Sequence, residues 1–474
     1  MRLRFSPRIV VSLAMAALAT SDAHAQDRPR AFVGAKIIPI EGDEIAAGTL
    51  VIEKGKITAV GPAADVKIPD GAEKVDVAGK VIMPGLVCTH SHIGGMRTGS
   101  GGADGSGPIQ PGVRIMDAIS VHDAGFKRAV AGGLTTLNIM PGSGHLISGQ
   151  TIYVKLRLEN PKPRKIDNFF ITASDGTPLG GLKMANGTNS MHEPPFPGSR
   201  GKSAFLVREQ YIKAREYHDK VTRAAGDPAK LPPRDLHLET LVEAMQGKRI
   251  VHHHTHRHDD IMTVLRLANE FQFKVVLHHI RDGWKVADEI AAAKVPCSVI
   301  VIDSPGGKLE ARDSKFETGG ILEKHGVPVA FHTDDYITDS RVFRRSAALA
   351  VRAGMSRSGA LKALTLAGAE MLGLQDRVGS LKPGKDADFA ILQGDPLSVY
   401  CQTQETWVEG RKVFDRSIAS DHLYAVGGFG AGSELVPYLC CYDNLFAGSD
   451  QCEMGSGVFF RAGWSSRRWV AWHW

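Results

Sequence analysis

The sequence predicts an α/β fold, in which a long central segment of alternating strands and helices lies between two short β-rich segments. In the centre, apolar strand-like runs alternate with amphipathic helix-like runs. Residues 26–84 read as short strands with glycine turns, and a similar β pattern returns in residues 371–418. The central segment, residues 85–370, is long enough for a (β/α)8 barrel of the TIM type, although an open parallel sheet has the same local pattern.

Residues 1–25 have the features of a signal peptide. They combine a basic start, an apolar run from Ile9 to Ala19, and the small-x-small pattern "AHA" that ends at Ala25. The apolar run is well short of the roughly 20 residues that cross a bilayer, which argues against an uncleaved membrane anchor. We therefore expect an exported protein, periplasmic or secreted, with no membrane association after cleavage.

The two β-rich segments are expected to form one small sheet domain from both ends of the chain. In the first segment "GTLVIEKGKITAVGP" alternates polar and apolar residues and turns at glycines, and "GSLKPGKDADFAILQGD" and "VEGRKVFD" do the same in the second. The chain would therefore leave this sheet after residue 84 and return to it near residue 371.

The central segment shows a β-α-β-α-β order with short links. The run "KRIVHHH" is followed by the helical "DDIMTVLRLANEFQ", then by "FKVVLHH", "WKVADEIAAA" and "PCSVIVI". In the first helix we expect Asp259 or Asp260 as the N-cap and Ile261, Val264 and Leu265 on one buried face. Repeated crossovers of this kind make a parallel sheet, in which functional side chains gather where the strands end.

The charge of the chain excludes one class of partner. The formal net charge is +6, and residues 1–25 account for part of it because they hold three arginines and one aspartate. So low a charge density does not indicate nucleic-acid binding. We expect a small-molecule substrate as the partner, and the helical exterior of a barrel would also permit a homo-oligomer.

Residues 419–474 read as an atypical C-terminal tail. The part after about residue 432 holds three of the six cysteines and four of the six tryptophans of the chain. We interpret it as either the product of a shifted reading frame or a lineage-specific extension. We assign it no catalytic role.

Metal-ligating side chains fall at the predicted ends of four strands. Neutral imidazoles together with a carboxylate suit zinc or a similar divalent ion, which lowers the pKa of a bound water to about 7. Each pair alone is weak evidence, but the order and the strand-end placement together favour one shared site. The side chains are His90 and His92, the run "HHHTHRH" from His252 to His258, His278 and His279, and Asp334.

From Ala31 to about Asp415 the chain resembles the amidohydrolase superfamily, most strongly its imidazolonepropionase-like and prolidase-like branch. "GKVIMPGLVCTHSHIGG" resembles the first-strand signature, "AGGLTTLNIMPGS" the second-strand region, and "GSLKPGKDADFAILQGDP" the return into a β-sandwich. The resemblance implies a metal-dependent hydrolase on a (β/α)8 barrel, with a small β-sandwich domain built from both chain ends. It also implies one or two divalent metal ions, with Zn2+ as the first expectation.

The resemblance implies a role for the first and the last of these strand ends. His90 and His92 would bind one metal ion, and Asp334 would bind metal from the eighth strand and carry a proton in catalysis. "AFHTDD" resembles the family's Gly-Thr-Asp end of that strand, which selects the first aspartate. Alternation along a strand would turn Asp335 outward.

The fifth and sixth strands would hold a second metal ion. "HTHRHDDI" is similar to the family pattern "HAHR-x-DDI" with His254 first, and "VVLHHIRDG" places the sixth-strand ligand at His279. His278 is then expected against the helical layer.

A carboxylated lysine on the fourth strand bridges the two metals in some members of the superfamily. Lys183 in "GGLKMANG" is the candidate for this role, and Lys155 in "TIYVKLRL" is a rival at a plausible strand position. The chain departs from the acidic "GEN" expected nearby and has "NGTN", which leaves the substrate contacts there undefined.

The function implied is hydrolysis of a carbon–nitrogen bond other than a peptide bond, in an amide or cyclic amide, by attack of a metal-bound hydroxide. An Xaa-Pro-like dipeptidase, a lactonase or a deaminase would use nearly the same ligands, because loops rather than ligands select the substrate. A metal-free exported binding or scaffold protein is the alternative from another class. The intact ligand set argues against that alternative.

Overall fold

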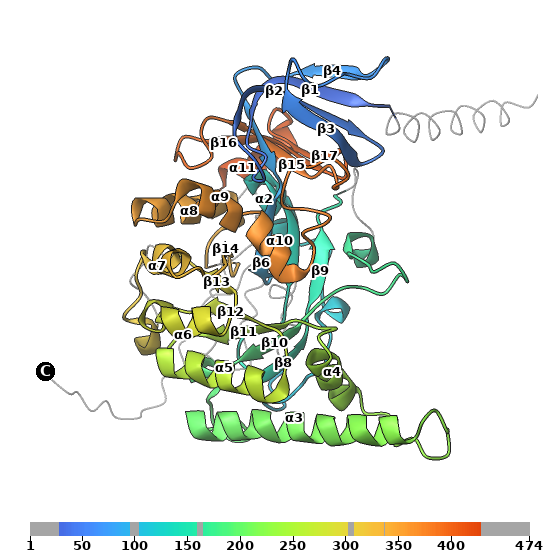
Figure 1. Ribbon diagram of the computed structural model, residues 1–474, viewed down its shortest axis with the longest axis vertical. Helices are drawn as coiled ribbons and strands as arrows, with labels where there is room; N and C mark the ends of the chain where they lie inside the picture. Colours follow the sequence, from blue (N-terminus) through green and yellow to red (C-terminus); the bar gives the residue numbers. More distant parts are fainter. Residues whose placement is uncertain (1–27, 95–103, 159–164, 302–307, 336, 428–474) are drawn as a thin grey trace, which may run out of the picture. The chain divides into compact units, whose positions relative to one another are not determined.

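The computed structural model describes residues 28–94, 104–158, 165–301, 308–335 and 337–427. The signal peptide predicted in residues 1–25 and the tail beyond residue 427 lie outside the described residues. None of the helices in the described part is long and apolar enough to cross a membrane. The fold is mixed α/β, as predicted (Figure 1).

Strands from both ends of the chain share one eight-stranded sheet, in the order β17-β16-β15-β5-β1-β2-β3 with β4 paired to β1 (Figure 1). The two ends meet where β5 pairs antiparallel with β15, with Met83 opposite Ala390. Phe32 packs edge-on against Phe389 and Trp407, with ring centroids 5.1 and 5.2 Å apart, in an apolar core that belongs to this sheet. The strands are β1 (Arg30–Ile37), β2 (Ile45–Glu53), β3 (Lys56–Pro62), β4 (Glu73–Asp76), β5 (Val81–Pro84), β15 (Phe389–Gln393), β16 (Gln402–Val408) and β17 (Arg411–Asp415).

The central strands form a six-stranded sheet, in the order β14-β13-β12-β11-β10-β8, and a three-stranded sheet, in the order β6-β7-β9. β10 to β14 are parallel, and so are β6 and β7. These strands are short and their residues are almost all buried, as expected for parallel strands that are covered on both faces. The strands are β6 (Leu86–Ser91), β7 (Leu134–Ile139), β8 (Ile147–Gln150), β9 (Ile152–Lys155), β10 (Leu182–Ala185), β11 (Val251–Thr255), β12 (Val275–His279), β13 (Cys297–Val299) and β14 (Val329–Phe331).

Helices alternate with these strands along the chain. In α5 the predicted apolar face of Ile261, Val264 and Leu265 is buried, but the helix begins at His258, so Asp259 lies in its first turn and the predicted N-cap is wrong. Aspartates in the first turn interact favourably with the helix dipole, so they stabilise the N-terminus of α5 without acting as its N-cap. The helices are α2 (Ala124–Gly132), α3 (Arg200–Arg223), α4 (Leu236–Met245), α5 (His258–Phe271), α6 (Ala287–Ala292), α7 (Thr318–Lys324), α8 (Phe343–Arg352), α9 (Arg357–Ala363), α10 (Leu366–Leu372) and α11 (Ala419–Val426). Short 3-10 helices are η1 (Ile115–Asp117), η2 (Ile166–Phe169), η3 (Gly187–Ser190), η4 (Gly283–Lys285), η5 (Leu309–Ala311) and η6 (Ser340–Val342).

The carboxyl ends of β6, β13 and β14 lie together although β6 belongs to a different sheet. The backbone N–H of Asp334, after β14, donates to the carbonyl of His90 in β6 at 3.0 Å. The hydroxyls of Thr89 in β6 and Ser298 in β13 are 2.6 Å apart. These contacts bring the first and the last predicted ligands of the chain to the same place.

Candidate metal centre

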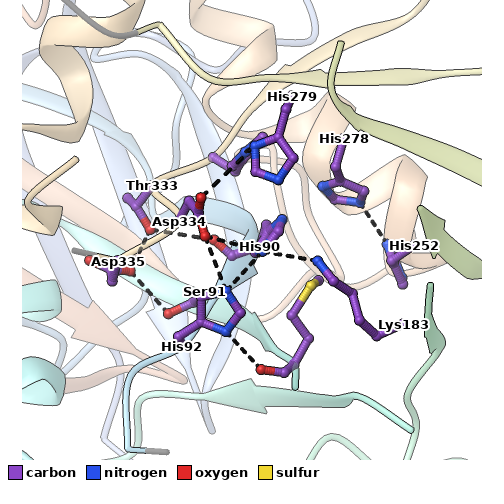
Figure 2. Close-up of polar contacts among 12 residues, drawn as sticks. His90, Ser91, His92, Lys183, His252, His278, His279, Thr333, Asp334 and Asp335 are labelled. Carbon is purple, nitrogen blue, oxygen red and sulfur yellow. Dashed lines mark hydrogen bonds and ion pairs between the residues drawn. The ribbon is translucent and has the colours of Figure 1, made fainter. Parts of the chain in front are cut away.

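His90, His92 and Asp334 form the inner cluster, a compact group of three potential ligand atoms (Figure 2). Nε2 of His90 lies 3.1 Å from Nε2 of His92 and 3.3 Å from Oδ1 of Asp334. Nε2 of His92 lies 3.1 Å from the same carboxylate oxygen. Ligand atoms bound tetrahedrally to one zinc ion at about 2.0–2.1 Å would be about 3.3 Å apart, so the spacing fits a single divalent ion.

The hydrogen bonding of His92 supports this fit. Its Nδ1 lies 2.9 Å from the carbonyl oxygen of Met140, which can only accept, so Nδ1 carries a proton and donates it. Nε2, on the opposite side of the ring, is thereby directed at the carboxylate of Asp334, 3.1 Å away. A backbone carbonyl that holds the second ring nitrogen in this way is typical of metal-binding histidines.

Burial favours the neutral form of three histidines at the site. It lowers the pKa of His90 and His279 well below the ordinary histidine value, and it lowers the pKa of His332 to about 3. Burial alone would raise the pKa of Asp334, but its contacts with His92 outweigh this and lower the pKa to about 2. Neutral imidazoles such as those of His90 and His279, beside an ionised carboxylate, are donors that suit a divalent metal.

His279 reaches the inner cluster because the strand ends irregularly. Its Nδ1 lies 3.9 Å from Oδ2 of Asp334, and its ring centroid lies 4.9 Å from that of His90 and 4.3 Å from that of His254. The φ of His279 is +71°, in the left-handed region, so the alternation of faces breaks at this residue.

His278 corrects the sequence prediction. It was expected against the helical layer, but its ring lies 5.1 Å from that of His90, and its Nε2 is 3.0 Å from Nδ1 of His252 (Figure 2). The register explains this position, because His278 is directly opposite His254 and neighbours in register share a face. Both adjacent histidines therefore face the site.

His332 is a residue of the site that the sequence reasoning missed. Its ring stacks on His90 with centroids 5.0 Å apart, and its Nε2 lies 3.2 Å from Nδ1 of His279. On its other side Nδ1 lies 2.7 Å from the hydroxyl of Ser298. Period-two alternation from Asp334 was the signal that could have identified it.

Of the two candidate lysines, the structure brings only Lys183 to the inner cluster. It is fully buried in β10, and its Nζ lies 3.3 Å from Nε2 of His90 (Figure 2). Lys155 is fully buried elsewhere, in ion pairs with Asp386, Asp388 and Glu409. That network ties β9 to the sheet formed by the chain ends and leaves Lys155 no place at the cluster.

Asp335 turns away from the inner cluster but is buried rather than solvent-exposed. It accepts hydrogen bonds from the hydroxyls of Ser91 at 3.0 Å, Ser340 at 2.5 Å and Thr333. Burial raises its pKa to about 6 against the opposing effect of these hydrogen bonds. Because Ser91 lies between His90 and His92, this carboxyl group positions the strand that carries both rings.

His254 lies at the end of β11 and contacts the rings of His256 and His279, with centroids 4.6 and 4.3 Å away. A second group of potential ligand atoms, one from each residue and all within 4.8 Å of one another, comes from His254, His256 and Glu310. Glu310 was not identified from the sequence, because no motif or strand end marks it. It is buried in η5, 56 residues along the chain from His254.

The chain is similar to proteins of one family. The model described as "Amidohydrolase family" matches residues 225–414. An amidohydrolase of known crystal structure from Thermotoga maritima MSB8 is 32% identical, with a TM-score of 0.75 over 81% of this chain and 100% of its own. Imidazolonepropionase from Rhizobium rhizogenes is 25% identical over 409 residues, 76% of this chain and 91% of its own. Amidohydrolase tasK from Hapsidospora irregularis is 26% identical over 403 residues, 80% of this chain but 41% of its own length.

The resemblance seen in the sequence is confirmed by these relationships. Identity of 32% across four fifths of the chain, together with the family model, is sufficient to assign the family. The chain belongs to the amidohydrolase family of metal-dependent hydrolases, enzymes that act on carbon–nitrogen bonds.

Proposed function

We propose that this protein hydrolyses an amide or cyclic amide bond at a metal ion held by His90, His92 and Asp334. The observation that carries the proposal is the inner cluster, in which three potential ligand atoms lie within 3.3 Å of one another and the carbonyl of Met140 orients the ring of His92 towards them. The cyclic-amide preference is supported by the relatedness to imidazolonepropionase. We also propose that the central sheets close into a (β/α)8 barrel and that the sheet from the chain ends is part of a β-sandwich.

A second divalent ion is part of the proposal, with His254 and His279 among its ligands and zinc as the metal. Support comes from the contact of the two rings, 4.3 Å apart, and from His279 Nε2, which has no hydrogen-bond partner within the described ranges. Lys183, carboxylated on Nζ, would bridge the two ions from its position beside His90.

The side chains divide the chemistry of hydrolysis between them. A bound divalent ion supplies Lewis acidity and lowers the pKa of water to near 7. Asp334, ionised and held by the hydrogen bond from its backbone N–H to the His90 carbonyl, accepts the proton of the attacking water and delivers it to the leaving nitrogen. His332 holds the ring of His279 in place through their 3.2 Å contact.

Export to the periplasm or the medium is proposed from the signal-like pattern of residues 1–25. The substrate would be a small molecule. A homo-oligomer is compatible with the proposal.

Metal content and turnover test the proposal together. We expect the purified protein to hold at least one divalent ion per chain and to hydrolyse members of a panel of cyclic amides, N-acyl amino acids, dipeptides and lactones. His90→Ala should lose the inner ion and all turnover, because it removes one of the three ligands of that ion, whose ligand atoms lie 3.3 Å or less from one another. His325→Gln, at the exposed end of α7, is the matched control and should change neither. Full activity without metal, or in His90→Ala, would contradict the proposal.

A further inference from the structure

Three buried side chains next to the inner cluster form a second group of potential metal ligands. Ligand atoms of His254, His256 and Glu310 lie within 4.8 Å of one another. His254 and His256 come from the end of β11 and the turn that follows it, and Glu310 comes from η5, so two separate segments converge there. Their exposed fractions are 3%, 7% and 8%, so bulk water does not solvate them freely.

The polar atoms of this group lack partners. Neither ring nitrogen of His254, nor Nδ1 of His256, nor Oε1 of Glu310 has a hydrogen-bond partner in the part of the chain that the structure describes. Buried polar atoms in native proteins are almost always paired, so four such atoms in one place indicate an absent ligand. Two neutral imidazoles and a carboxylate are donors that a divalent metal accepts.

Within the described residues, Glu310 is held through one of its two carboxylate oxygens. Oε2 accepts from the guanidinium of Arg200 at 3.0 Å and from the backbone N–H of Thr188 at 2.9 Å. The Arg200 guanidinium is itself held by Asp260 at 2.8 Å. A Cβ at Gly187 would lie 2.8 Å from Oε2, so a larger residue there would displace this carboxylate from its position against η3.

We propose that His254, His256 and Glu310 form the outer cation site, a site for a divalent ion that is distinct from the inner cluster. The inference rests on the proposed function, since His254 is one of the ligands assigned there to a second ion. It adds His256 and Glu310 to the ligands of that ion. Glu310 is the carboxylate of the group, and it supplies the negative charge that a divalent cation needs beside two imidazoles.

Zinc titration of the metal-free full-length protein, followed by a competing chelator, tests the outer cation site. We expect wild type to bind two zinc ions per chain. Glu310→Gln and His256→Gln should each bind one ion, because each removes a ligand of the outer cation site and leaves the inner cluster intact. Arg200 contacts Oε2 of Glu310, the oxygen that does not face the ion, so Arg200→Gln should weaken the affinity for the second ion by roughly 10- to 100-fold.

His258→Gln is the matched control, because His258 belongs to the same histidine-rich segment but pairs with Asp282 and not with the group. It should bind two ions with wild-type affinity. His90→Ala should keep the outer ion and lose the inner one, so loss of metal binding at one site can be distinguished from loss at the other. Unfolding of each metal-free variant is measured in parallel, and if Glu310→Gln does not fold, His256→Gln decides.

The outcomes separate the two proposals. If Glu310→Gln and His256→Gln bind zinc with the wild-type number and affinity, the outer cation site is wrong and the inner site stands. If wild type binds one ion, and that ion is lost in His90→Ala but kept in Glu310→Gln, the outer cation site is also wrong. If wild type binds none, both proposals are wrong.

Discussion

A hydrogen bond on the far side of a ring determines which nitrogen of His92 can bind a cation. The carbonyl of Met140 accepts a hydrogen bond from Nδ1, so Nε2 is directed at the inner cluster. Asp335 acts in a similar way through Ser91, because it holds the residue between His90 and His92. Groups outside a set of ligands therefore orient it, as they do in characterised metal sites.

At the scale of single residues, we predict that Lys183 is carboxylated. An ammonium group cannot bind a cation, whereas a carbamate on Nζ, 3.3 Å from His90 Nε2, has oxygens that can. In buffer with 13C-bicarbonate we expect a carbamate resonance in the 13C NMR spectrum of the metal-loaded protein, and no such resonance in Lys183→Met. A carbamate signal that survives in Lys183→Met would place the modification elsewhere, and no signal in loaded wild type would exclude it.

At the scale of elements, short irregular segments after the strands position the ligands. The left-handed φ of +71° at His279 and +48° at Asp334 redirect the chain at the two strand ends that meet in the cluster. η3 is a third example, because its first residue, Gly187, combines a φ of +76° with the close approach of Glu310. Regular strands bring the segments together, and these local departures turn the side chains.

Substitution of Gly187 measures what η3 contributes. In Gly187→Ala the left-handed φ and the clash with Glu310 should both reduce stability. Gly226→Ala is the matched control, since its φ is +83° but no atom lies within 4 Å of the added Cβ. We expect the control to lose about 1–2 kcal/mol in urea unfolding, and Gly187→Ala to lose about 1–3 kcal/mol more. Equal losses would show that Glu310 tolerates the methyl group.

At the scale of the molecule, one buried ionic network connects a central strand to the sheet built from the chain ends. Lys155 of β9 pairs with Asp386, Asp388 and Glu409, which precede or follow strands of that sheet. Burial opposes ionisation of Asp386, but the charges of Lys155 and its neighbours outweigh it and lower the pKa of Asp386 to about 2. The network makes the association of the two parts dependent on pH.

The contribution of Asp386 to the pH dependence of stability has a definite sign. A carboxylate whose pKa is lower in the folded state stabilises that state above its unfolded pKa, and the stabilisation is lost as the pH falls from about 4 towards 2. For Asp386 the loss is about 2 kcal/mol. We expect urea unfolding of the metal-free protein to show it, and Asp386→Asn to be less stable at pH 7 and flatter over this range. Asp395→Asn, which removes a more exposed pair with Arg357, is the control and should lose less than about 1 kcal/mol. Parallel pH profiles for wild type and Asp386→Asn would contradict the assignment.

The sequence alone was sufficient for the mixed α/β fold, the family and the strand ends that carry His90, His92, His254, His279 and Asp334, because periodicity and short motifs are local properties of a chain. Three features were decided only by tertiary structure: the turn of His278 towards the site, the stacking of His332 on His90, and the approach of Glu310 to His254. Each depends on register, on a single left-handed residue or on contact between distant segments. Alternation along the strand could place His332 on the same face as Asp334, but the contact of its ring with His90 and the positions of His278 and Glu310 are set by how the whole chain packs.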